Sequence, residues 1–179
     1  MLRYKVTTAA TVHPILATDA TVHDHMRIGA NDTSYDALIA EYILAATLEI
    51  ERYIGYPLMT QVVEIRIDKT LIVNQPLIGN INDIISYSYY DGSSTITETG
   101  VLATGLPINK YGNMAYTLNR AWPSGAEYKI KCNAGYTIIL CPDDIKQACR
   151  LLVLSYFENR EGKQEMPATV TRILDLHAL

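Results

Sequence analysis

The stretch Cys141–Arg160 constrains the fold of this chain more than any other; it reads CPDDIKQACRLLVLSYFENR. Pro142 lacks a backbone N–H and belongs at a helix start, and the two aspartates after it can cap the free N–H groups of the first turn. From Leu151 to Phe157 only Ser155 is polar, so the predicted helix is apolar nearly all round. Such a helix is buried on more than one side. We expect one side to face the chain's own core and the other to contact another subunit or the β-rich middle of the chain.

A second long helix is predicted from Ser34 to about Ile54, and Gly55 and Pro57 end it. Its inward stripe recurs at spacings of four and three residues and comprises Ile39, Ile43, Ala46, Ile50 and Tyr53, widened by Leu38, Tyr42 and Leu48. A short helix is expected between Thr18 and Gly29, and Pro167 can start another near the end of the chain.

The pattern changes to alternation between the long helices. Gln61–Asp68 places Val63, Ile65 and Ile67 on one face of a half-buried strand. Further strands are predicted at Leu71–Val73, Ile81–Tyr90, Thr95–Thr97, Met114–Leu118 and Tyr128–Cys132, with a hairpin turn at Asp91-Gly92. These elements predict an α+β fold, a helical bundle of two long and two short helices with an inserted antiparallel β-sheet subdomain. We expect a single domain over residues 1–179, with its helical part at about 18–56 and 141–178 and the β insert at about 60–136.

Composition disfavours several classes of protein. The net charge is −4 and the pI is about 5.5, whereas a sequence-independent grip on DNA needs a basic face. The three cysteines form no CxxC pair, which predicts free thiols in a reducing compartment. No apolar run follows a basic start and no uncharged run has the length of a membrane span, so we expect neither a signal peptide nor a membrane partner. Thirteen tyrosines against one phenylalanine suit half-buried sheet faces and subunit contacts.

Possible catalytic and metal-binding residues have simpler structural explanations. His23 and His25 are two residues apart and would point to different faces of a helix, so they could not chelate one ion together. Asp143-Asp144 could be a carboxylate pair for acid–base chemistry, but at a helix start capping explains it better. Cys149 lies on an apolar stripe and is expected to be a small core residue. We therefore predict no catalytic residue, no cofactor and no metal, and expect that the protein is not an enzyme.

Several stretches follow one another in an order and spacing that is similar to a known family. They are Thr18–Ile28, Asp36–Ile39, Tyr53–Leu58, Gln61–Asp68, Ala121–Pro123, Asn133–Tyr136, Pro142–Ala148, Tyr156–Glu161 and Pro167–Leu174. In this sequence they resemble the head–tail connector proteins of tailed bacteriophages, also called adaptor or head completion proteins, in the subgroup with a β insert. The region Asp91–Lys110 has no counterpart in that pattern.

The resemblance implies a structural virion protein without catalysis. Such a protein forms a dodecameric ring beneath the portal and joins the DNA-filled capsid to the tail. Its partners would be other copies of itself, the portal protein, and a stopper or tail-completion protein. Its place would be the virion neck, after assembly in the host cytoplasm. DNA would pass through the lumen without specific binding, which the acidic balance of the chain also favours.

Three sets of residues are candidates for these contacts. The subunit interface is expected at Leu151, Leu154, Tyr156, Phe157 and Arg160. The portal contact is expected at Val170, Ile173, Leu174 and Leu176, because a short helix after a polar linker needs a surface to pack against. Removing that segment is expected to spare the main domain. The tail-side contact is expected at the loop Asp91, Gly92, Ser93 and Ser94.

An alternative from another functional class remains open at this point. The chain could be a small tyrosine-rich β-type module that binds a carbohydrate or a peptide. Its stacking surface would then comprise Tyr87, Tyr89, Tyr90 and Tyr111.

Overall fold

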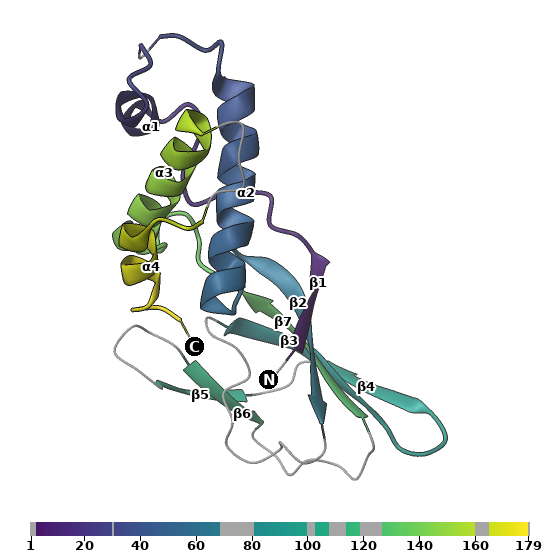
Figure 1. Ribbon diagram of the computed structural model, residues 1–179. Coiled ribbons are helices and arrows are strands. Elements are labelled where there is room, and N and C mark those ends of the chain that lie inside the picture. The colour runs from purple at the N-terminus through teal and green to yellow at the C-terminus, as the bar shows by residue number, and fades with distance from the viewer. Residues whose placement is uncertain are drawn as a thin grey trace. The chain divides into compact units, whose positions relative to one another are not determined.

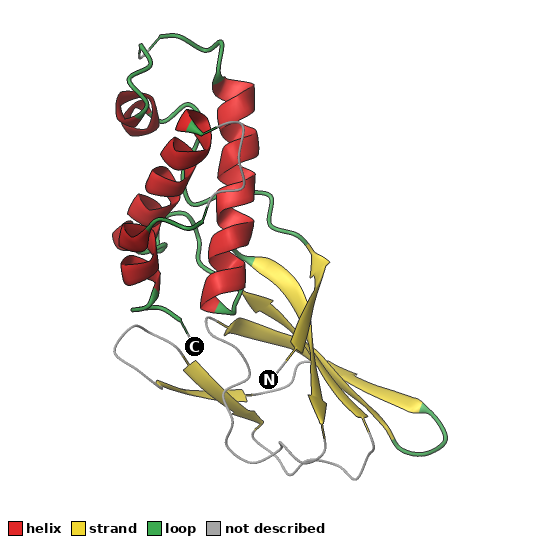
Figure 2. Ribbon diagram, in the orientation of Figure 1, coloured by secondary structure: helices red, strands yellow, loops and turns green. Residues whose placement is uncertain are grey.

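The computed structural model describes residues 3–29, 31–68, 81–99, 103–107, 114–118, 127–159 and 165–178 (Figure 1). The chain divides into two compact units, one of Met1–Ala10 with Thr60–Gly135 and one of Thr11–Met59 with Tyr136–Leu179. The first contains the described strands and the second contains the described helices (Figure 2). That the chain forms a single domain stays a prediction.

The strand unit contains a five-stranded antiparallel sheet in the order β1-β2-β7-β3-β4. Its strands are β1 (Arg3–Thr8), β2 (Gln61–Asp68), β3 (Ile81–Tyr90), β4 (Thr95–Thr99) and β7 (Glu127–Ala134). A separate two-stranded sheet pairs β5 (Ala103–Pro107) with β6 (Met114–Leu118). The strand expected at Leu71–Val73 lies outside the described residues.

The two central strands show why these residues form a half-buried sheet. Ile65 of β2 lies opposite Ile130 of β7, and both side chains are fully buried. One position away, Glu64 lies opposite Lys131 on the other face. Opposite charges at paired positions stabilise an antiparallel sheet by about 0.2–1 kcal/mol. The alternation predicted from the sequence for this part of the sheet is confirmed.

The helical unit contains α1 (Ala20–His25), α2 (Asp36–Ile54), α3 (Asp143–Glu158) and α4 (Ala168–Leu174). The helix α2 ends as expected, because Gly55 has a φ of 85° in the left-handed region, where a glycine is least strained. The helices α2 and α3 pack together, and α3 also contacts α4 and α1. Figure 1 shows α1, α3 and α4 on the same side of α2.

The predicted helical bundle with an inserted sheet is wrong, although the α+β class fits. The helices α1 and α4 have 6 and 7 residues, too few to lie alongside α2, which has 19, over its length. They cover parts of α3 rather than complete a bundle. The sheet is not confined to the insert either, because β1, which lies near the N-terminus, pairs with β2 at one edge. The strand β1 supplies hydrogen-bond partners that β2 would otherwise lack as an edge strand.

Candidate functional site

The environment of α3 accounts for much of its apolar character within one chain. Its buried residues are Ile145, Ala148, Cys149, Leu152, Val153 and Ser155. The contacts of α3 with α2 on one hand, and with α4 and α1 on the other, are all made inside the helical unit. We expected the second apolar side of α3 to contact another subunit or the β insert. The chain's own short helices partly cover that side. A subunit contact through α3 stays a prediction.

The candidate interface residues of α3 lie at the margin of this packing. Leu151, Leu154 and Phe157 are half-buried, and Arg160 lies outside the described residues. The ring of Phe157 meets the ring of Tyr35 edge-on, with 5.7 Å between centroids and 80° between planes. This contact joins the end of α3 to the residue that precedes α2.

Tyr156, the remaining interface candidate, connects α3 to α2. Its hydroxyl donates a hydrogen bond to the carboxylate of Glu49, and its ring lies 6.1 Å from that of Tyr42. Burial, together with the hydrogen bond and the nearby charge of Glu49, raises the pKa of Tyr156 well above its usual range. Tyr156 therefore stays protonated and can hold the Glu49 carboxylate at any physiological pH.

We expect Tyr156→Phe to lower the free energy of unfolding by about 1 kcal/mol, because a half-buried carboxylate then lacks its donor. Urea unfolding measures this loss. The matched control is Tyr53→Phe, which removes the exposed hydrogen bond from the Tyr53 hydroxyl to Asp175 and is expected to cost less. Equal losses in both variants would contradict a special role for the Glu49 contact.

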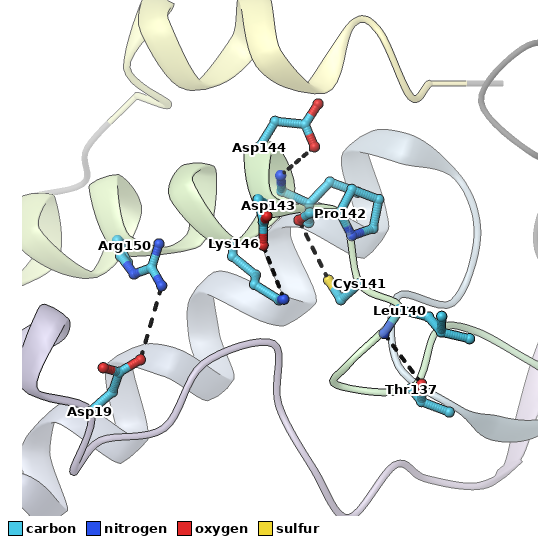
Figure 3. A network of polar contacts seen from close by, with 10 residues as sticks. Asp19, Thr137, Leu140, Cys141, Pro142, Asp143, Asp144, Lys146 and Arg150 are labelled. Carbon is cyan, nitrogen blue, oxygen red and sulfur yellow. Dashed lines mark hydrogen bonds and ion pairs between the residues drawn. The ribbon is translucent and has the colours of Figure 1, made fainter.

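Polar contacts hold the start of α3 (Figure 3). The carboxylate of Asp144 accepts the backbone N–H of Ile145 at 2.8 Å, and that of Asp143 lies 3.2 Å from the Lys146 ammonium. Asp144 also lies 2.8 Å from the Nε2 atom of His177, which is buried. The N-cap of α3 is Pro142 and no side-chain cap hydrogen bond forms, so the aspartates do not cap the helix as expected; they lie in its first turn, where Asp144 also contacts the C-terminal segment.

The segment that we assigned to the portal is packed inside its own unit. Val170 and Leu174 are completely buried, and Ile173 is half-buried. Among the four candidates, only Leu176 is exposed, at 49%. The apolar stripe of α4 therefore serves the fold first, and Leu176, which lies just after the helix, is the candidate with an exposed side chain.

The predicted hairpin between β3 and β4 is confirmed. Tyr90 pairs with Thr95, so the connecting loop consists of the four candidate tail-side residues, Asp91, Gly92, Ser93 and Ser94, all of them exposed. The Asp91 carboxylate accepts the backbone N–H groups of Ser93 at 2.8 Å and Ser94 at 2.9 Å. These bonds lower the pKa of Asp91. Hydrogen bonds to Asp91 therefore order the loop, and its four residues stay exposed to solvent.

The three cysteines are free, as predicted, and all three are buried. Burial raises the pKa of Cys132 to about 12, that of Cys141 to about 11 and that of Cys149 to about 12, from an ordinary value of 9.0. None of them offers a thiolate nucleophile near neutral pH. This supports the prediction that Cys149 is a core residue.

These thiols predict a loss of stability at alkaline pH. Their folded pKa values lie above the unfolded value of 9.0, so the stabilisation is complete below about pH 9 and is lost as the pH rises through 11–12. Each thiol contributes up to about 1.4 kcal/mol per pH unit in that window. Urea unfolding at several pH values between about 8 and 11 measures the slope. A free energy of unfolding that is constant over this pH range would contradict the raised pKa values of the three buried thiols.

The tyrosines that a carbohydrate- or peptide-binding module would need do not form one exposed surface among the described residues. Tyr87 is completely buried and its ring stacks on that of Tyr89, with centroids 5.9 Å apart. Tyr90 follows on the other face of the strand, and its hydroxyl donates to the carbonyl of Gly92. Tyr111 lies outside the described residues.

Among the residues that the structure describes, the sequence analysis did not predict which apolar side chains are the most exposed. Ile139 is 84% exposed and Leu140 70% exposed, in the turn that precedes α3. On α2, Leu48 was expected to widen the inward stripe, yet it is 53% exposed, and Leu44 one turn earlier is 47% exposed. The sequence contained a signal for the exposure of Ile139 and Leu140. These two aliphatic residues lie shortly before the N-cap Pro142, outside any strand or helix that could bury them.

No group of three or more metal-ligating side chains is gathered in the part of the chain that the structure describes. Within the same residues, no helix has both the length and the apolar character needed to cross a membrane. The features that do stand out are surfaces: an exposed apolar turn, an exposed stripe on α2 and an ordered hairpin loop. Exposed apolar surfaces of this kind are typical of contacts with other chains.

The chain belongs to the head completion protein family, whose model matches residues 16–172. This confirms the resemblance found in the sequence, and it makes the chain a structural head–tail connector protein of a phage or phage-like virion. None of the curated proteins matches the sequence.

Three chains from gene transfer agent particles are among the solved structures that share its fold. A chain in the neck of an empty gene transfer agent particle with C6 symmetry has a TM-score of 0.71 and 18% identity, over 98% of this chain and 95% of that chain. A chain in the virion of a native gene transfer agent particle has a TM-score of 0.70 and 20% identity, over 98% and 94%. A chain in the neck of a native particle with C12 symmetry has a TM-score of 0.67 and 19% identity, over 97% and 94%.

Proposed function

We propose that this chain forms a homo-oligomeric ring in the virion neck, beneath the portal, and joins the DNA-filled head to the tail. The observation that carries the proposal is the family match over residues 16–172. The similar chains in particle necks with C6 and C12 symmetry support a ring, and twelve copies fit both symmetries. The protein contributes no catalysis or cofactor in this role.

The ring has two further partners, one on each side. The portal protein contacts the C-terminal segment through Leu176, with Ile173 at the margin of the contact. A stopper or tail-completion protein contacts the loop of Asp91, Gly92, Ser93 and Ser94, whose exposure supports this assignment. DNA passes through the lumen without specific binding, which is supported by the net charge of −4.

The mass of the assembly tests the proposal. Mass photometry of the purified chain, alone and with the portal protein of the same particle, is expected to detect a species of twelve times the 20.0 kDa monomer. The half-buried α3 residues contribute to the ring, so Leu154→Glu is expected to reduce that species and leave a folded monomer. A chain that stays monomeric at high concentration and on the portal would contradict the proposed function.

A further inference from the structure

The turn before α3 displays two large aliphatic side chains, Ile139 and Leu140, which we call the apolar turn. They are 84% and 70% exposed. The turn is ordered, because Thr137 accepts through its carbonyl the backbone N–H of Leu140 at 3.1 Å and that of Cys141 at 2.9 Å. Figure 3 shows Leu140 and Thr137 in this turn, next to the start of α3. Adjacent aliphatic residues held this far into solvent indicate a contact surface rather than a folding requirement.

A second exposed apolar surface lies on α2. Leu44 and Leu48 are one turn apart, 47% and 53% exposed, and exposed Arg52 follows one turn later. We call these three residues the α2 stripe. About half of each leucine side chain is exposed, so the chain's own helices leave the stripe uncovered. The apolar turn does not cover it either, since both surfaces remain exposed within one chain.

The charges beside the two surfaces are complementary. The apolar turn is followed by Asp143, whose side chain is 97% exposed although its carboxylate also lies 3.2 Å from the Lys146 ammonium, and by Asp144, which is 44% exposed. The α2 stripe ends in the positive charge of Arg52, and exposed Glu41 lies beyond its other end. A contact between the surfaces is therefore favoured in the direction that places Asp143 at Arg52 and keeps it away from Glu41.

We propose that the apolar turn of one copy packs against the α2 stripe of the next copy around the ring. The inference rests on the proposed ring and names the surfaces that close it. A cyclic ring needs two different surfaces on every copy, one for each neighbour, whereas a two-fold dimer uses one surface twice. The apolar turn and the α2 stripe are such a pair, matched in apolar character and opposite in charge.

Two charge-introducing variants test the two surfaces separately. Ile139→Asp and Leu48→Asp are each expected to abolish the ring and leave a folded monomer, because both side chains are exposed. The matched control is Leu16→Asp, since Leu16 is also 53% exposed but belongs to neither surface. The control is expected to form rings like the unmodified chain. Rings of normal size from either variant would overturn the proposal, even if the variant lost its binding to the portal.

Mixing the two variants tests the head-to-tail arrangement. Ile139→Asp keeps an intact α2 stripe and Leu48→Asp keeps an intact apolar turn, so one contact can form between them. The mixture is expected to give a one-to-one dimer that cannot grow. A mixture that stays monomeric, or that yields full rings, would overturn the proposal.

A charge exchange tests the direction of the contact. Arg52→Glu is expected to raise the concentration needed for assembly at least about fivefold at low salt. The second change Asp143→Arg is expected to restore most of that loss in the double variant. A double variant that assembles worse than either single variant would overturn the pairing of the two charges.

Crosslinking gives a readout that does not depend on the strength of assembly. The double variant Leu48→Cys with Ile139→Cys is expected to give, after mild oxidation, a ladder of covalent multiples of the 20.0 kDa chain on a denaturing gel. Each single variant is expected to stay monomeric, and the three native thiols contribute little because they are buried. Rings without a ladder would overturn the inference and leave the proposed function standing. The absence of rings from the unmodified chain would instead contradict the proposed function itself.

Discussion

Truncation after Glu165 is expected to destabilise the helical unit by about 5 kcal/mol or more. The deletion removes Val170 and Leu174, both completely buried, and exposes the side of α3 against which α4 packs. Loss of one large buried side chain costs about 2–5 kcal/mol, and a domain has only about 5–15 kcal/mol in all. Thermal unfolding followed by circular dichroism measures the effect. This expectation differs from the one drawn from the sequence, which treated the segment as dispensable for folding.

A shorter truncation serves as the control. Ending the chain after His177 keeps α4 and the contact of His177 with Asp144, so the melting temperature is expected to stay within a few degrees of that of the full chain. If the chain ending at Glu165 melts at the same temperature as the full chain, α4 does not contribute to the core.

Ile43→Ala in α2 is expected to lower the free energy of unfolding by about 2–5 kcal/mol. The Ile43 side chain is 1% exposed, so its loss leaves a cavity in the core of the helical unit. In a chain of this size the melting temperature is expected to fall by about 2–4 °C for each kcal/mol.

The neighbouring residue provides the control for this change. Leu44 is 47% exposed, and Leu44→Ala is expected to change the stability of the monomer by less than about 0.5 kcal/mol. The same substitution lies in the α2 stripe, so it is expected to weaken ring assembly. A similar loss of monomer stability in both variants would contradict the burial that separates these two neighbours.

Local patterns in the sequence were sufficient to predict most secondary structure. The alternation in β2, the cap glycine of α2 and the proline before α3 each act within a few residues, and each element formed where expected. The family resemblance also depended on the order of such local stretches, and it is confirmed. The candidate contact residues could be named in the same way, but no local pattern shows whether an apolar residue faces the core or a partner.

Tertiary packing decided which apolar residues are buried within the chain and which stay exposed. The sequence alone determined the α+β class, the long helices, the hairpin after Tyr90 and the core position of Cys149, because periodicity and turn residues are short-range properties. Only the folded chain showed that α4 covers α3, that β1 completes the sheet edge, and that Leu48 and Ile139 stay exposed. These outcomes depend on contacts between segments far apart in the sequence. Whether a helix face is buried depends on which distant segment packs against it, and the periodicity of the helix does not identify that segment.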